Sequence, residues 1–214
     1  TLLDEKNLAL LEENRQLVPV FSIGGGAEET ARRRGSGISS QVYRAMEDLA
    51  ERKILFGASV TVSRENFRTV TDPSFVAGLR AQGCGLLIYV EYVAVDEDTA
   101  HLCLGEEEAR ALVQMVAQYK KNIQDMILLS FPGDEAAMGG CLASGRGFFH
   151  VNAAGGAEPC PFSPYAKQNL KKDSILEVLE SDYFAALRDV AKNAEEQVGG
   201  CTLFVHRDKV QALQ

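Results

Sequence analysis

Apolar residues form two different patterns along the first part of the chain. Segments with apolar residues at three- and four-residue spacing are typical of helices that pack on a sheet. They alternate with short, nearly continuous apolar runs, which are typical of buried strands. Strands joined by helical crossovers are parallel and hold ligands at their carboxyl ends. The pattern therefore predicts an α/β fold with parallel strands at 18–23, 55–62, 86–95 and 126–131.

Polar residues and glycines at the segment ends indicate where the helices start and stop. Ser39 or Ser40 is expected to cap one crossover helix. Asp72 and Pro73 mark the start of the next, and Gly83 its end. Because a helix precedes the first strand and only four strands follow, we expect an incomplete (βα) barrel whose earlier part precedes this chain. The first strand would then present a bare edge and favour self-association.

The amino-acid composition of the chain changes after about residue 133. The stretch from 139 to 165 is dense in glycine, proline and small residues. Its residues 148–151 predict a brief strand, and 153–156 a turn, so we expect a β-hairpin there rather than a crossover. A helical segment at about 174–192 follows. The sequence therefore predicts two parts: barrel strands in 1–133 and a hairpin-and-helix extension in 134–214.

Charge and hydropathy narrow the class of protein. The net charge of -8 argues against a general nucleic-acid binder, because phosphates would be repelled. The longest apolar run, 86–95, is broken by Glu91 and is too short to span a bilayer, so no membrane association is expected. No basic and apolar leader is visible, which favours a cytoplasmic location.

Five cysteines are present, at positions 84, 103, 141, 160 and 201. An odd number without an export signal favours free thiols or metal ligands over disulfides. The predicted hairpin carries Cys160 back toward Cys141, and Cys201 follows a pair of glycines at the end of the extension. These three thiols are therefore expected to meet.

The sequence resembles a known family in three segments: FSIGGGAEETARRRGSG at 21–37, ILFGASVTVSRENF at 54–67, and GRGFFHVNAAGGAEPCPF at 145–162. In order and spacing they are similar to the later part of a radical SAM iron–sulfur oxidoreductase with a carboxy-terminal cysteine extension of the SPASM or twitch kind. The resemblance implies a partial TIM-type barrel. It also implies that the intact enzyme cleaves S-adenosylmethionine reductively to a 5'-deoxyadenosyl radical, which abstracts hydrogen from a substrate.

The family binds its catalytic 4Fe–4S cluster through a CxxxCxxC loop, and this sequence contains none. By that resemblance the catalytic cluster belongs to a missing amino-terminal part, and this chain alone is expected to be inactive. The substrate could be a peptide or a small metabolite.

Four residues are candidate contacts to S-adenosylmethionine. Ser22 matches the position where the family contacts the amino-acid end of the cofactor, although it could equally cap its own loop. Arg34, our preferred arginine of the run 32–34, precedes a glycine-rich turn with free backbone donors and suits a carboxylate, but could be solvated. Ser59 could face the pocket or be an ordinary strand residue. Glu91, in an apolar strand, could approach the ligand or form a structural ion pair.

The resemblance further implies that Cys141, Cys160 and Cys201 hold an auxiliary 4Fe–4S cluster. The alternative is three unrelated buried thiols. A fourth ligand is not obvious. Cys103 is the better of the two remaining cysteines, because it follows the strand at 86–95 and should lie at the carboxyl end of the sheet, whereas Cys84 precedes that strand and should lie at the opposite end. Zinc is the competing metal, with His150 or His206 as the fourth ligand.

Three function classes stay open: part of a radical SAM enzyme, a non-catalytic zinc- or cluster-binding interaction module, and a small hydrolase. The hydrolase is disfavoured because no G-x-S-x-G motif is present.

Overall fold

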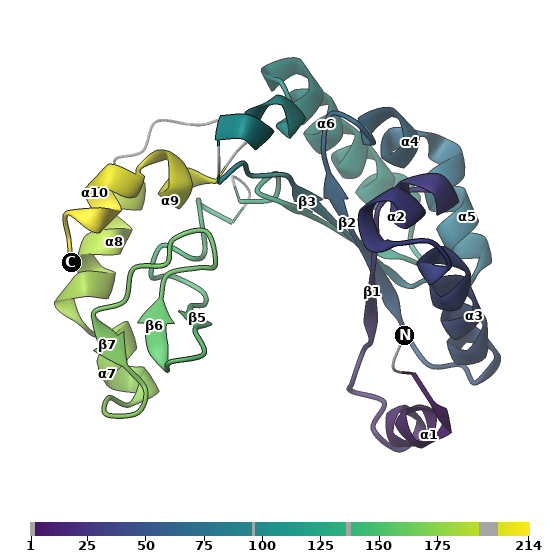
Figure 1. Cartoon of the computed structure of the whole chain (residues 1–214), viewed down its shortest axis with the longest axis horizontal. Coiled ribbons are helices and arrows are strands. Elements are labelled where there is room, and N and C mark those ends of the chain that lie inside the picture. The colour runs from purple at the N-terminus through teal and green to yellow at the C-terminus, as the bar shows by residue number, and fades with distance from the viewer. Residues whose placement is uncertain (1–2, 96, 136–137, 193–200) are drawn as a thin grey trace. The chain divides into compact units, whose positions relative to one another are not determined.

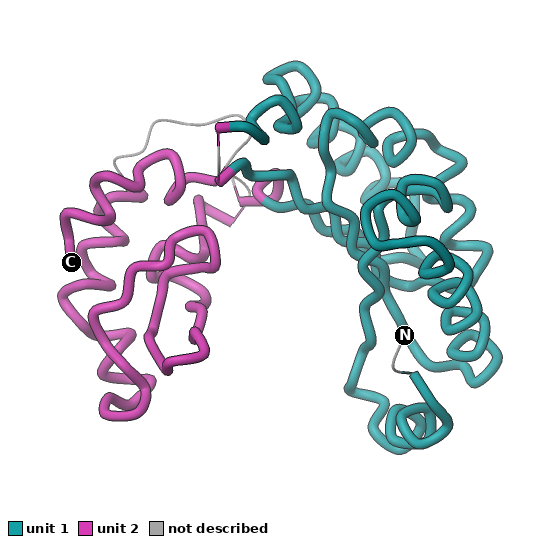
Figure 2. The backbone as a smooth tube through the Cα atoms, in the orientation of Figure 1, with its two compact units in different colours: residues 1–94, 98–131 teal, residues 95–97, 132–214 magenta. Residues whose placement is uncertain are grey.

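A computed structural model of the chain describes residues 3–95, 97–135, 138–192 and 201–214. It divides into two compact units (Figure 2). Unit 1 comprises Thr1–Ala94 and Asp98–Phe131, and unit 2 comprises Val95–Glu97 and Pro132–Gln214.

Unit 1 is built on a four-stranded sheet whose strands follow one another in the order β1-β2-β3-β4. All three strand pairs are parallel, which confirms the predicted α/β fold. β1 lies at one edge of the sheet, as expected; pairing of two copies through that edge stays a prediction. The strands are β1 (Val20–Ile23), β2 (Gly57–Val62), β3 (Leu86–Glu91) and β4 (Ile127–Phe131).

Helices fill each crossover of unit 1, and α2 to α6 lie on one face of the sheet (Figure 1). A short 3-10 helix, η1 (Glu97–Leu102), follows β3. The α-helices are α1 (Glu5–Glu13), α2 (Ala27–Arg34), α3 (Ile38–Glu51), α4 (Phe67–Thr71), α5 (Pro73–Ala81) and α6 (Glu106–Asn122).

Strand alternation decides which side chains face the helices. In β2, Val60 and Val62 are fully buried, whereas Ser59 between the buried positions is half-exposed. Met46 and Leu49 of α3 are fully buried in the same core. Each such side chain contributes roughly 1.5–3 kcal/mol through removal of its apolar surface from water. This one-sided core fixes the register of the strands and hence the place of each strand end.

One helix start differs from the sequence prediction. Ser39 does not cap α3 but lies inside it, and Gly37, with a φ of 82°, is the cap residue. Glycine is favoured there because other residues are strained at positive φ. The arginine run 32–34 forms the last turn of α2, directly before the glycine-rich turn at 35–37. By contrast, Asp72 caps α5 as predicted, through a 2.8 Å bond from the backbone N–H of Ser74.

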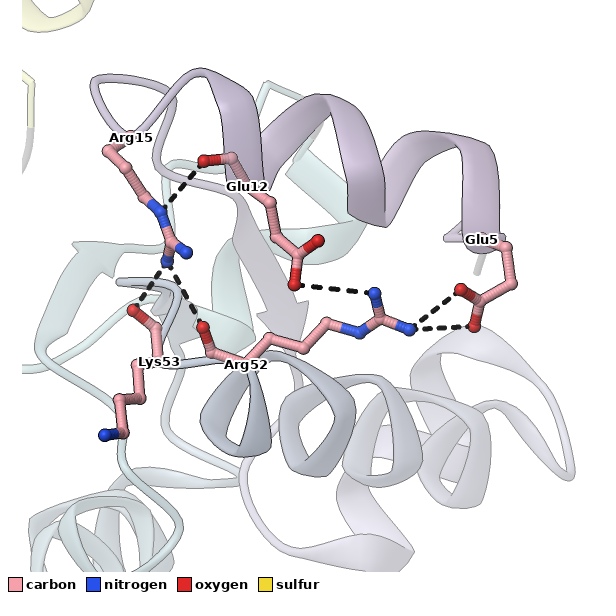
Figure 3. A network of polar contacts seen from close by, with 5 residues as sticks. All are labelled: Glu5, Glu12, Arg15, Arg52 and Lys53. Carbon is pink, nitrogen blue, oxygen red and sulfur yellow. Dashed lines mark hydrogen bonds and ion pairs between the residues drawn. The ribbon is translucent and has the colours of Figure 1, made fainter.

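Two arginines hold α1 against the rest of unit 1 (Figure 3). Arg52 donates to both carboxylate oxygens of Glu5, at 2.9 and 2.8 Å, and lies 3.5 Å from Glu12. Arg15 donates to the carbonyl of Lys53 at 2.8 Å. Arg52 and Lys53 precede β2, so α1 is held away from the carboxyl ends of the strands, where sheets of this kind bind ligands.

Unit 2 has a three-stranded antiparallel sheet of order β5-β6-β7, packed with short helices. Pairing of β5 with β6 confirms the predicted hairpin. The predicted helix at 174–192 is two helices, because the chain turns at Glu180 and Ser181. The elements are β5 (His150–Val151), β6 (Gly156–Glu158), β7 (Gln168–Asn169), α7 (Ile175–Leu179), α8 (Asp182–Lys192), α9 (Thr202–Val205) and α10 (Arg207–Gln211).

Within the described ranges, the helices are all too short or too polar to cross a membrane.

Candidate functional site

A pocket of about 260 Å³ opens at the carboxyl ends of β1, β2 and β3. Each of these strands contributes a residue that follows its last position, and α2 contributes its polar face. Parallel α/β sheets bind ligands at this end because loops and helix termini present free polar groups there. The pocket is lined by Gly24, Glu29, Arg32, Arg33, Ser63, Glu65, Asn66, Tyr92 and Leu102.

The glycine run after β1 forms the tight turn into α2. A Cβ on Gly24 would lie 2.6 Å from the carbonyl oxygen of Glu29, closer than real side chains approach. The backbone N–H of Gly24 donates to the hydroxyl of buried Thr30 at 3.0 Å. These contacts bring the first turn of α2 directly beside the end of β1.

Asn66 joins the turn after β1 to the turn after β2. Its amide nitrogen donates to the carbonyls of Gly24 at 2.7 Å and Thr61 at 2.9 Å. Its amide oxygen accepts from the backbone N–H of Ser63 at 2.8 Å. The side chain is 5% exposed, so these bonds form away from water. Asn66 was not among the predicted site residues; an asparagine three residues after Ser63, the polar residue that follows β2, is the signal that could have found it.

The pocket lining carries both signs of charge. Arg32 and Arg33 contribute guanidinium groups, and Glu29 and Glu65 contribute carboxylates. Thr69 donates to Glu29 at 2.8 Å and so orients that carboxylate. A lining of this composition suits a ligand that bears a carboxylate and an ammonium group on neighbouring atoms.

The four residues predicted to contact S-adenosylmethionine are not among the residues that line the pocket. Arg34 is exposed and is not part of the pocket lining; partial burial, and then the like charge of Arg33, lower its pKa. Ser22 and Ser59 are register partners on β1 and β2, on the face opposite the helices. Glu91 is 4% exposed at the end of β3 and shares with Tyr89 the face that the helices cover. The pocket therefore shares the strand ends with these residues but is lined by others.

Three thiols of unit 2 lie close together. Cys141 and Cys160 are buried in its core, and Cys201 packs against that core from the start of α9. The thiols of Cys160 and Cys201 are hydrogen-bonded to each other, and Cys141 is near enough to both for their charges to interact. The structure thus brings together the three cysteines that the sequence analysis grouped.

Backbone N–H groups are directed at these sulfurs. Ala143 provides one to Cys141, Phe162 provides one to Cys160, and Leu203 and Phe204 provide two to Cys201. Such amide donors are a feature of sulfur ligands around iron–sulfur clusters.

The ionisation of the three thiols reflects their surroundings. The hydrogen bond with Cys160, helped by the amide donors, lowers the pKa of Cys201 to about 7. The same hydrogen bond, and burial, raise the pKa of Cys160. Burial, and then the charge of Glu135, raise the pKa of Cys141 to about 12. Cys201 is therefore the first of the three to supply a thiolate.

The remaining candidate ligands lie elsewhere. Cys103 belongs to unit 1, and Cys84 is buried in the unit 1 core beside β3. His150 is bonded through Nδ1 to Glu158 at 2.8 Å, across the β5–β6 pair. Across the part of the chain that the structure describes, no three His, Cys, Asp or Glu side chains form a group that could hold a single metal ion.

Comparisons with known proteins give a structural match only. No family model and no curated protein sequence matches the chain. The solved structure of native anSMEcpe with bound AdoMet and Cp18Cys peptide matches with a TM-score of 0.68 and 17% identity. That match covers 95% of this chain and 61% of the other.

A second solved protein, Streptococcus suis SuiB, matches with a TM-score of 0.67 and 12% identity, over 88% of this chain and 49% of SuiB. SuiB bound to precursor peptide SuiA matches with a TM-score of 0.61 and 12% identity, over 85% of this chain and 46% of that one. This chain thus spans about half to three fifths of the structures it matches. Its α/β fold, with a four-stranded parallel sheet and a small antiparallel sheet, resembles the partial barrel of radical SAM enzymes.

Proposed function

We propose that unit 1 binds S-adenosylmethionine in the pocket at the ends of β1 to β3, as the later part of a radical SAM enzyme. The observation that carries the proposal is the lining of that pocket, with charges of both signs beside apolar side chains. The fold supports it, since a structure with bound AdoMet is similar over 95% of this chain. At about 260 Å³ the pocket lies near the lower end of ligand sites, so it would hold one end of the cofactor.

The lining residues suit the two ends of S-adenosylmethionine, which are a charged amino-acid group and a flat adenine ring. Arg32 and Arg33 would pair with its carboxylate, and Glu29 with its ammonium group. Tyr92 and Leu102 offer an apolar wall, which suits the flat adenine ring. Bound to a reduced catalytic cluster, the cofactor supplies a 5'-deoxyadenosyl radical for hydrogen abstraction. The residues of this chain would bind and orient the cofactor and exclude water from it.

The catalytic cluster would be held outside the present sequence, which has no CxxxCxxC motif. β1 leaves a sheet edge with free backbone groups, which preceding strands of a partial barrel would pair with. In this arrangement the chain contributes the later strands, and the catalytic activity requires both parts.

Unit 2 would hold an auxiliary 4Fe–4S cluster through Cys141, Cys160 and Cys201. The donors fit such a group, because thiolates are its usual ligands and amide N–H groups surround these sulfurs. Each cysteine of a cluster binds a different iron atom, so the thiols need not converge on one point as ligands of a single ion do. When bound, the cluster supplies one-electron transfer.

The substrate of the intact enzyme would be a peptide rather than a small metabolite. Peptides accompany both anSMEcpe and SuiB in their solved structures. In unit 1, the sheet face opposite α2 to α6 carries half-buried Ile88 and Leu129, an apolar wall that suits side chains of a peptide.

Titration calorimetry of the anaerobic chain with S-adenosylmethionine tests the pocket. Wild-type protein is expected to bind saturably. The double variant Arg32→Ala/Arg33→Ala should bind at least about tenfold more weakly, since charged hydrogen bonds contribute roughly 1.5–3 kcal/mol each.

The double variant Lys120→Ala/Lys121→Ala, on α6, is the matched control because it removes the same charge outside the pocket. It should bind like wild type. Absence of saturable binding by the wild-type chain, or equal weakening by both double variants, would overturn the proposed pocket.

The alternative is a non-catalytic zinc- or cluster-binding interaction module. The three adjacent thiols favour this module as much as they favour the auxiliary site. The module does not, however, account for the charged pocket in unit 1. A chain that takes up stoichiometric zinc, stays colourless and ignores S-adenosylmethionine would favour the module.

A further inference from the structure

Glu135 lies beside the three thiols, on the segment that leads into Cys141. Its backbone N–H donates to the carbonyl of Pro132 at 2.7 Å. The backbone N–H of Gly140 in turn donates to the carbonyl of Glu135, also at 2.7 Å. The second bond folds the chain back, so that Glu135 is brought next to Cys141 although six positions separate them.

The carboxylate of Glu135 interacts with two of the three thiols. It is hydrogen-bonded to the thiol of Cys141, and its charge acts on the thiol of Cys201 as well. The side chain is half-buried, so this contact forms largely away from water. Glu135, Cys141, Cys160 and Cys201 all belong to unit 2.

Each iron of a four-iron cluster has one external ligand position, and three cysteines leave the position on one iron open. Iron accepts carboxylate oxygen as well as thiolate sulfur. We propose that Glu135 is the fourth ligand of the auxiliary cluster, through a carboxylate oxygen. The inference deepens the proposed function and rests on it, since it presumes that Cys141, Cys160 and Cys201 bind a cluster.

An oxygen ligand would make one iron different from the other three. The competing explanation is a structural hydrogen bond, in which Glu135 orients the Cys141 thiol and never touches iron. The two explanations differ for Glu135→Ala, which removes a ligand from one iron if Glu135 binds it and leaves the iron environment unchanged if Glu135 only orients Cys141. A cysteine at position 135 would give an all-thiolate ligand set.

The test is anaerobic reconstitution of the full chain with iron and sulfide, followed by Mössbauer spectroscopy and by measurement of iron per chain. Wild type is expected to bind about four irons, of which about one in four gives a distinct doublet. Glu135→Ala should lose that doublet and up to about one iron per chain, and Glu135→Cys should keep all the iron with a uniform spectrum.

Glu180→Ala, an exposed carboxylate at the end of α7 in the same unit, is the matched control and should behave like wild type. Glu135→Gln preserves size and serves if the alanine variant unfolds; it too should lose the distinct doublet. Wild-type and Glu135→Gln or Glu135→Ala spectra that coincide, with equal iron, would overturn the ligand role and leave the auxiliary cluster standing. A wild-type chain that binds no iron and sulfide would overturn both.

Discussion

Replacing Asn66 by alanine is expected to destabilise unit 1 by about 2–4 kcal/mol and to weaken binding in its pocket. The change removes the amide that bonds to Gly24, Thr61 and Ser63. It leaves two carbonyl groups and one N–H without their partners. The bonds to Gly24 and Ser63 are buried and the bond to Thr61 is partly buried, so water offsets part of the roughly 1–3 kcal/mol that each unsatisfied group costs. The turns after β1 and β2 would then separate and the pocket would lose its walls.

Urea unfolding of the full chain, followed by circular dichroism, measures the free-energy change. Hydrogen exchange of peptides over 20–35 and 57–70 reports whether the two turns loosen. Asn122→Ala, at the exposed end of α6, is the matched control and should change neither. If Asn66→Ala unfolds within about 0.5 kcal/mol of the control and exchanges like wild type, Asn66 does not hold the pocket together.

Replacing Phe184 by alanine should destabilise unit 2 by about 3–5 kcal/mol. Phe184 is fully buried, and its ring lies 5.8 Å from the ring of Phe149 and 5.8 Å from that of Tyr183, both edge-on. These residues pack in the same core as Cys141 and Cys160. The truncation leaves a cavity in addition to removing apolar contact, which is why the expected cost exceeds the transfer energy of the ring alone.

Phe148→Ala is the matched control, because Phe148 is 48% exposed. Both variants are compared by urea unfolding and by iron uptake during reconstitution. Phe184→Ala should lower stability several times more than Phe148→Ala and should reduce iron uptake, since the thiols would lose their support. Equal effects of the two phenylalanine changes would mean that this core does not support the thiol group.

The sheet of unit 1 was predictable because burial imposes a period on the sequence. Apolar runs of strand length alternate with amphipathic helices, and all three strand pairs are parallel as predicted. Helix starts were less predictable. Asp72 caps α5 through its side chain, a signal that the sequence shows, whereas Gly37 begins α3 through a backbone angle that no pattern displays.

The pocket was only partly predictable for a related reason. Ser22 was a candidate because it matches a position of the family that the sequence resembles, and Ser59 because alternation along its strand could place it toward the pocket. The pocket lining instead comes from residues just beyond the strands, such as Gly24 and Ser63, and from the arginines of α2. Their positions depend on loop geometry and on the hydrogen bonds of Asn66, which connect positions 42 residues apart.

The surroundings of the three thiols were also only partly predictable. A hairpin necessarily returns the chain, so the approach of Cys160 to Cys141 could be predicted from the turn between them. The placement of Glu135 could not, because it depends on backbone bonds to Pro132 and Gly140 and on burial against Cys141.

Anaerobic reconstitution of the wild-type chain, with iron, sulfide and zinc measured alongside the visible spectrum, tests the central claim most directly. The account predicts about four irons and four sulfides per chain and broad visible absorption. Both should be lost in Cys160→Ala and retained in Cys84→Ala, a buried thiol of unit 1. A colourless wild-type chain that carries stoichiometric zinc, or a coloured Cys160→Ala chain with unchanged iron, would contradict the account.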